Sequence, residues 1–239
     1  MDKDILKRDL LADEEFFLSK IPMTKDEYED LVEEYQVRAF TVSKYTNLQV
    51  LKKFHEELMK AIEDGNTVTE FRESMNDFLK RKGFDGITKY QADNIFRTNI
   101  QTAFNVGHYK AMTSPAVKKA RPYWMYSAVN DSHTRPSHLA MDGKVFRVDD
   151  PVWDTWYPPN GFRCRCTVIT LSPQQVERMG LEVSEGQPPN GITPQGELVP
   201  IMPDKLFNQN IAKQFYELDV STFPEAMQAV YNKTVKNAR

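Results

Sequence analysis

The chain of 239 residues lacks several features that would define its surroundings. No apolar run approaches the roughly 18 residues that a membrane-spanning helix needs, and residues 1–11 are charged where a secretory signal would be apolar. Only two cysteines are present, Cys164 and Cys166, and a ring closed over the single residue between them would be strained. We therefore expect a protein of a reducing, cytosol-like compartment that contacts no membrane, with both cysteines as thiols or metal ligands.

Catalytic signatures are missing as well. The sequence has no His-Glu-x-x-His zinc-protease motif, no glycine-rich phosphate loop and no Gly-x-Ser-x-Gly nucleophile turn. We therefore expect that the protein is not an enzyme and has no small-molecule substrate. With 40% hydrophobic and 27% charged residues, the composition predicts a globular protein of one large or two small domains.

Charge is distributed unevenly along the chain. Residues 1–40 contain 12 acidic and 6 basic residues, whereas residues 80–135 contain 10 basic and 3 acidic residues. Opposite signs on the two segments predict two partners. The acidic residues 1–40 would bind another protein, and the basic residues 80–135 would bind the phosphates of double-stranded DNA. The alternative is that both segments are ordinary solvated helix faces. The candidate DNA-binding residues are six cations of this middle region: Lys80, Arg81, Lys82, Lys118, Lys119 and Arg121.

Helix signals agree with hydrophobic periodicity over the first half of the chain. Capping boxes, in which two side chains satisfy free amides at a helix start, are predicted at Thr24, Thr67 and Thr88. The spacing predicts helices over about 24–40, 51–64, 67–82 and from 88 onward, with Gly65 and Gly83 as end signals. On the last and longest of them, polar residues step by three or four positions and form one ridge: Asn94, Arg97, Gln101, Asn105 and His108.

Shorter elements are expected after Pro115. Residues 123–129, 144–148 and 167–171 are rich in aromatic and β-branched residues and predict the strands of a small antiparallel sheet. A short helix over about 173–179, a Gly/Pro-rich linker or surface loop over 181–203 and a last helix over 223–237 follow. The fold class is therefore α+β, with an N-terminal helical bundle, a small sheet and C-terminal helices. We divide the chain into an acidic helical segment (1–46), a central domain (47–180), the loop (181–203) and a C-terminal helical segment (204–239).

Side chains that bind metals gather in the central domain. Cys164 and Cys166 would point to the same side of a strand, because strand side chains alternate. Together with His138 and one of Asp131 or His133, they would supply the four donors of a structural zinc site. The alternative is a pair of reduced cysteines that only pack in the core.

The loop at residues 131–138 has two candidate supports. Within it, Arg135 is expected to pair with Asp131 or Asp142 and so hold the loop in place. From the long helix, Arg97 and Gln101 are expected to lie beneath the loop and satisfy its backbone or carboxylate groups. The alternative for the helix is that its polar ridge faces water.

Three motifs occur in a fixed order in this region: Asp131-Ser132-x-Thr134-Arg135-Pro136-x-His138, Asp142-Gly143-Lys144-Val145-Phe146, and Pro158-Pro159-Asn160-Gly161-x-x-Cys164-Arg165-Cys166. Together they closely resemble the signature of the phage Mu protein F-like head morphogenesis domain. An upstream Arg97-Thr98-Asn99 segment resembles the family's Arg-Thr segment, so that the resemblance covers about residues 89–171. The motifs and the polar ridge together give candidate structural roles to seven residues: Arg97, Asn99, Gln101, Thr134, Arg135, Asp142 and Gly143.

This resemblance implies a minor head protein of a tailed phage or of a Mu-like prophage. Such a protein would be a low-copy structural component of the virion head, joining the procapsid in the bacterial host cytoplasm. It would associate with the portal protein and contact packaged double-stranded DNA. Two alternatives from other classes stay open: a metal-dependent nuclease or toxin-associated enzymatic domain, and an adaptor that binds only protein.

Overall fold

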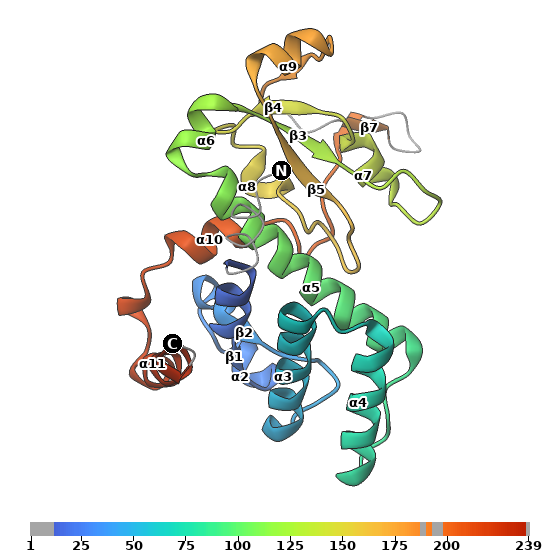
Figure 1. Ribbon diagram of the computed structural model, residues 1–239, viewed down its shortest axis with the longest axis vertical. Helices are drawn as coiled ribbons and strands as arrows, with labels where there is room; N and C mark the ends of the chain where they lie inside the picture. Colours follow the sequence, from blue (N-terminus) through green and yellow to red (C-terminus); the bar gives the residue numbers. More distant parts are fainter. Residues whose placement is uncertain (1–11, 187–189, 193–197, 238–239) are drawn as a thin grey trace. The chain divides into compact units, whose positions relative to one another are not determined.

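The computed structural model describes residues 12–186, 190–192 and 198–237 (Figure 1). Its internal contacts divide the chain into two compact units. Unit 1 contains the described residues up to His108 and from Ile211 onward, and unit 2 contains those from Tyr109 to Asn210. The boundary between them falls within helix α5 (Lys89–Met112). These contact-based units cut across the four segments drawn from the sequence, and that division stays a prediction.

Helices α3 (Leu48–Asp64), α4 (Val68–Arg81) and α5 begin where their sequence signals lie, and α3 and α4 also end at theirs. Helix α3 begins after Asn47, whose side chain accepts hydrogen bonds from two first-turn amides, and ends at Gly65, where φ is 75°. Glycine adopts this left-handed conformation without steric cost. Helix α4 begins with the Thr67 capping box, and α5 begins with the matching pair at Thr88. The predictions for these helices are confirmed.

The helix predicted over residues 24–40 is wrong beyond its first turn. The Thr24 capping box forms, but helix α2 covers only Lys25–Glu29, and a 3-10 helix, η1 (Glu33–Arg38), follows after a break. A continuous helix would place acidic side chains four residues apart, at 29 and 33 and at 30 and 34. Like charges at this spacing repel, and carboxylates are unfavourable at the negative end of the helix dipole.

The remaining elements of unit 1 pack around a separate core. Residues 12–18 are helical, and the strands β1 (Ile21–Pro22) and β2 (Ala39–Phe40) pair in parallel. Ile21 and Tyr35 pack against Phe223 and Met227, so the two ends of the sequence share one core. The C-terminal elements that take part are η2 (Val220–Thr222) and α11 (Glu225–Asn237), whereas α10 (Ile211–Glu217) packs Phe215 against Phe16.

Unit 2 is built on a four-stranded sheet. Its strand order is β5 (Thr167–Leu171), β3 (Tyr123–Ser127), β4 (Val145–Arg147) and β6 (Val183–Ser184). The two pairs that involve β3 are antiparallel, as predicted, whereas β6 pairs with β4 in parallel. The register sets Trp124 beside both Phe146 and Thr170. Four short helices accompany the sheet: α6 (Pro115–Ala120), α7 (Pro136–Met141), α8 (Trp153–Trp156) and α9 (Pro173–Arg178).

The two faces of this sheet are covered by different helices, because strand side chains alternate between faces. Trp124 is buried on one face, where its ring centroid lies 5.5 Å from that of Trp153 of α8. The opposite face packs Val145 and Leu171 against Val176 of α9. Strand β3 therefore lies between two apolar layers, and residues at its end are fixed by the core.

The segment 181–203 was predicted as a linker or surface loop, and this is wrong for its first residues. Strand β6 joins the sheet, and Leu181 and Val183 pack beside Val145. Strands β7 (Asn190–Ile192) and β8 (Leu198–Pro200) form a hairpin. Residues 187–189 and 193–197 of the predicted loop lie outside the described part of the chain.

The mixture of helices and small sheets confirms the predicted α+β class. Among the helices of the described residues, none is both long and apolar enough to span a lipid bilayer.

Candidate metal centre

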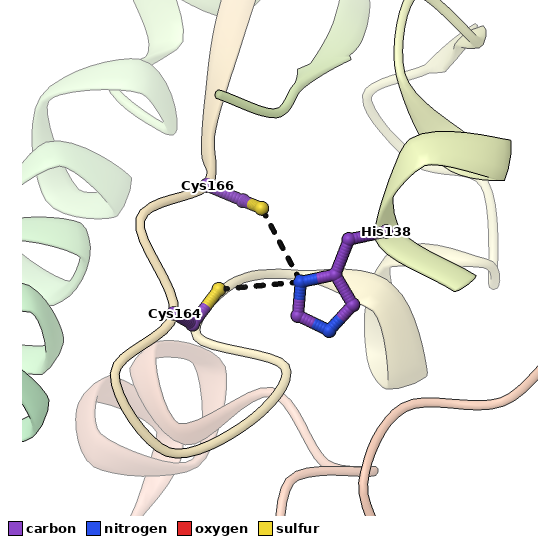
Figure 2. Close-up of side chains that lie close together, drawn as sticks. All are labelled: His138, Cys164 and Cys166. Carbon is purple, nitrogen blue, oxygen red and sulfur yellow. Dashed lines mark hydrogen bonds between the residues drawn. The ribbon is translucent and has the colours of Figure 1, made fainter. Parts of the chain in front are cut away.

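Two elements of unit 2 bring His138, Cys164 and Cys166 together (Figure 2). His138 lies on α7, which begins at Pro136, a residue whose fixed φ suits the first position of a helix. The two cysteines lie in extended chain immediately before β5. Alternate residues of extended chain face the same side. Both sulfurs accordingly point toward the imidazole, as Figure 2 shows.

The cluster is compact and buried. Nδ1 of His138 lies 3.4 Å from Sγ of Cys166 and 3.7 Å from Sγ of Cys164. His138 and Cys166 are each 2% exposed, Cys164 is 3% exposed, and both cysteines are free thiols. Nε2 of His138 is also buried and has no hydrogen-bond partner among the described residues. Burying polar groups away from water costs folding free energy unless these groups bind one another or an ion.

The two thiols differ in pKa. A hydrogen bond from Cys166 lowers the pKa of Cys164 below its usual value, with further hydrogen bonds from His138 and the backbone of Asn160 acting against burial. The same interaction, followed by burial, raises the pKa of Cys166 far above its usual value. The pair therefore favours one thiolate, and thiolate is the form of cysteine that binds metals.

Tyr126 and Asn160 line the cluster beside Cys166. The Tyr126 hydroxyl donates to Oδ1 of Asn160 at 2.9 Å, and it also hydrogen-bonds Cys166. Burial and the two neighbouring cysteines raise the pKa of Tyr126 well above its usual value, so this group keeps its proton. Both residues are fully buried, and the Asn160 amide donates to the carbonyl oxygen of Thr155 at 3.3 Å.

The fourth predicted ligand does not join the cluster. The Asp131 carboxylate is held by both terminal nitrogens of Arg165, at 2.6 Å and 2.7 Å, and this bond lowers the pKa of Asp131. His133, the other candidate, is 83% exposed and lies 4.0 Å from Asp131. Arg165 stands between the two cysteines, so strand alternation sends its side chain outward while theirs point inward.

Arg135 pairs with neither of the residues predicted for it. Its guanidinium lies 3.2 Å from the Asp204 carboxylate and donates to the carbonyl oxygen of Phe162 at 3.0 Å. The competing partner Asp131 is bound by Arg165, as described above. Gly161 permits the approach, because a Cβ atom there would lie 2.5 Å from Oδ2 of Asp204.

The Asp142-Gly143 turn holds the other end of the loop. The Asp142 carboxylate accepts hydrogen bonds from the Ala128 amide and the Asn130 side chain, each at 2.7 Å. Gly143 has φ of 74° and its amide donates to the carbonyl oxygen of Tyr126 at 2.9 Å. The Thr134 hydroxyl donates to the carbonyl oxygen of Val129. These motif residues thus shape the loop rather than contact the sulfurs.

The polar ridge of α5 belongs to unit 1, whereas the loop at 131–138 belongs to unit 2. Arg97 donates to the Asp93 carboxylate of its own helix at 2.6 Å and is 50% exposed. Asn99 donates to the carbonyl oxygen of Ile95 at 2.8 Å. The placement of Arg97 and Gln101 beneath the loop stays a prediction.

The six candidate DNA-binding cations are divided between the units. Lys80, Arg81 and Lys82 are exposed at the end of α4 in unit 1, and Lys118 and Lys119 are exposed on α6 in unit 2. Arg121 differs from the others, because it donates to the carbonyl and hydroxyl oxygens of Thr170 at 2.6–3.2 Å. A single surface formed by all six stays a prediction.

Comparison with known proteins bears on the motifs that build this centre. Residues 52–169 match the family described as Phage Mu protein F like protein. The matched range runs from α3 to β5 and contains the three clustered metal-binding side chains. The resemblance carried by the three sequence motifs is thus confirmed.

Two relatives of this Mu F-like chain cover similar parts of it. It is 40% identical over 169 residues to the Mu-like prophage FluMu F protein of Haemophilus influenzae, a match that covers 66% of the chain and 40% of the relative. It is 37% identical over 175 residues to the "Putative capsid assembly protein F" of Escherichia phage Mu, covering 66% of the chain and 39% of the relative. The chain thus spans about 40% of the length of these relatives. No solved structure gives a significant match.

Several residues of the Mu F-like centre were not found by sequence reasoning. Tyr126 was read only as part of a strand, although its place one residue before the strand end would allow it to reach the loops. Asn160 and Gly161 were noted as motif residues without a role. No signal pointed to Asp204, which lies 69 positions after Arg135 in a Pro-rich segment.

Proposed function

We propose that the chain is a structural protein of a phage or prophage head that acts during capsid assembly. The observation that carries this proposal is its 37% identity over 175 residues to the phage Mu protein named for capsid assembly. The geometry supports a structural role, because motif residues bind one another: Arg165 binds Asp131, and Arg135 binds the backbone of Phe162. Side chains held in such charge-assisted contacts fix loops in place.

Two charged surfaces support finer proposals about partners. Exposed acidic residues of α2 and η1, such as Asp26, Glu29 and Glu33, would contact the portal protein or another procapsid component. The exposed lysines of α6, Lys118 and Lys119, would contact the phosphates of packaged double-stranded DNA. The protein would then be part of the procapsid that forms in the host cytoplasm.

The role in head assembly is tested by deleting the coding sequence from the phage or prophage genome that carries it. After induction, we expect few DNA-filled heads by electron microscopy, with recovery when the gene is supplied from a plasmid. Mass spectrometry of purified wild-type heads should detect the chain. Normal yields of infectious particles without the gene would contradict the proposal.

Portal association is tested by co-purification of the intact chain with the portal protein of the same phage. Changing Asp26, Glu29 and Glu33 together to Lys should abolish co-purification at low salt, because it reverses the charge of this surface. The matched control changes Glu56, Glu63 and Asp64, three exposed acidic residues on α3, to Lys. Equal loss in both variants would show that net charge, and not this surface, controls binding.

DNA contact is tested by titrating duplex DNA at several salt concentrations. Changing both Lys118 and Lys119 to Ala should flatten the log-log dependence of affinity on salt by up to about 1.8, since each neutralised phosphate contributes about 0.9. As a control, changing the exposed Lys205 to Ala should leave the salt dependence of affinity unaltered. Nicking of a supercoiled plasmid with added Mg²⁺ or Zn²⁺ would instead support the nuclease alternative.

A further inference from the structure

We propose that His138, Cys164 and Cys166 bind one zinc ion, which fastens α7 to the chain entering β5. The donors would be Nδ1 of His138 and the two sulfurs, which all lie within 4.8 Å of one another. This site does not depend on the proposed role in head assembly. It would act on the stability of unit 2 itself.

The spacing of the donor atoms matches a zinc site. Tetrahedral bonds of about 2.3 Å to sulfur and about 2.05 Å to nitrogen place neighbouring S and N donors about 3.6 Å apart. The two observed distances from Nδ1 of His138, 3.4 Å to Cys166 and 3.7 Å to Cys164, lie on either side of this value. A metal at the centre of the three atoms therefore needs only small movements of the side chains.

Hydrogen bonding alone satisfies this arrangement less well. Nδ1 of a neutral imidazole carries either one proton or one lone pair, so it can make one good hydrogen bond, yet both sulfurs face it. All three side chains are at most 3% exposed, so water does not compensate readily. A cation that accepts electron pairs from both sulfurs and from the nitrogen removes this conflict.

The surroundings supply hydrogen bonds to the sulfurs. The backbone of Asn160 hydrogen-bonds Cys164, and the backbone of Arg165 hydrogen-bonds Cys166. Backbone amide donors to sulfur favour thiolate over thiol. Groups in the shell around metal ligands orient those ligands in the same way.

The donor set selects the metal. Two thiolates and an imidazole suit zinc, whereas magnesium, calcium and manganese prefer oxygen donors. The His, Cys, Asp and Glu side chains of the described residues supply three donors to the cluster, so an oxygen ligand would complete the tetrahedron.

The zinc ion would join parts of unit 2 that are distant in sequence. His138 and Cys164 are separated by 26 positions, and the chain between them includes β4 and α8. Closing a loop of this length through a metal restricts the unfolded chain and stabilises the folded one. The proposal therefore predicts that zinc and stability are linked.

The test uses the full chain, purified in the presence of zinc chloride and then dialysed. Elemental mass spectrometry should find one zinc ion per chain. Titration of the two thiols with a mercurial reagent should release that zinc into a coloured chelator in proportion to the thiols modified. A strong chelator should lower the melting temperature of the wild-type chain.

Matched variants locate the site. His138→Gln and Cys166→Ser should lose stoichiometric zinc, whereas His133→Gln should keep it, because His133 is an exposed histidine of the same loop region. If the first two variants fail to fold, cobalt(II) added to the wild-type chain should still give the visible absorption of a tetrahedral thiolate site. Wild-type protein that takes up no zinc or cobalt, or zinc retained in folded His138→Gln and Cys166→Ser, would overturn the proposal.

Discussion

Replacing Gly161 with alanine tests how the loop before Cys164 is held. A Cβ atom at this position would lie 2.5 Å from Oδ2 and 3.0 Å from Cγ of Asp204, and 3.1 Å from Cζ of Arg135. The first distance is too short for any stable contact, so the ion pair must move. Asp204 has limited room to do so, because its backbone amide is bound to the carbonyl oxygen of Asn160.

The expected cost has two parts. Adding a methyl group to a filled site costs about 1–3 kcal/mol, and the lower half of that range applies because the clashing atoms are side-chain ends. Loss of a half-exposed ion pair adds at most about 1 kcal/mol. We expect Gly161→Ala to lower the free energy of unfolding by about 1–3 kcal/mol. Urea unfolding followed by tryptophan fluorescence measures this in unit 2, which contains all three tryptophans.

A second substitution decides whether the clash is the cause. In the double variant with Asp204→Ala, the obstructing carboxylate is gone, so most of the loss caused by Gly161→Ala should disappear. Gly143→Ala serves as the control: no atom lies near its Cβ position, but its φ of 74° is left-handed, so it should cost about 1–2 kcal/mol. Asp204→Ala should not rescue it. Strictly additive losses for Gly161 and Asp204 would refute the steric argument.

Three further predictions concern other contacts. Asn47→Ala should lower the free energy of unfolding by about 1 kcal/mol through loss of the α3 cap, whereas Asn47→Asp should keep it, both measured by urea unfolding. Arg121→Ala should lower it by about 1.5–3 kcal/mol, because the charged hydrogen bonds to Thr170 are lost, and a thermal melt unaffected by the change would contradict this. The pKa of Asp131 is lowered by Arg165, so its contribution to stability is present above the unfolded pKa of about 4 and is lost as pH falls through the folded value. Asp131→Asn should flatten the acid limb of a stability–pH curve, and NMR titration of Asp131 should show the lowered value directly.

Sequence signals succeeded where the physics is local. The capping boxes at Thr67 and Thr88 join side chains only three residues from their partner amides, so neighbouring residues alone decide them. The convergence of Cys164 and Cys166 on one side follows from the alternation of extended chain in the same way. Neither inference required knowledge of the rest of the fold.

The same reasoning failed where distant residues compete. Arg135 had two acidic candidates close in sequence, but Arg165 holds one of them and Asp204 arrives from a segment with no recognisable signal. Strand β6 likewise forms because it pairs with the free edge of β4. The Gly/Pro content of residues 181–203 gave no indication of this pairing. The predicted helix over 24–40 matched the apolar spacing but not the repulsion among its acidic residues.

The single residue between the two cysteines makes this stretch of chain sensitive to its length as well as to its composition. Arg165 reaches outward to Asp131, while the residues on either side of it face the imidazole of His138. Inserting or deleting one residue between Cys166 and Ile169 would reverse the sides to which residues 164–166 point, bringing a guanidinium into the core and a sulfur to the surface. Changes in loop length among proteins of this kind are therefore expected elsewhere, in turns whose ends are not locked to both a buried cluster and a surface ion pair.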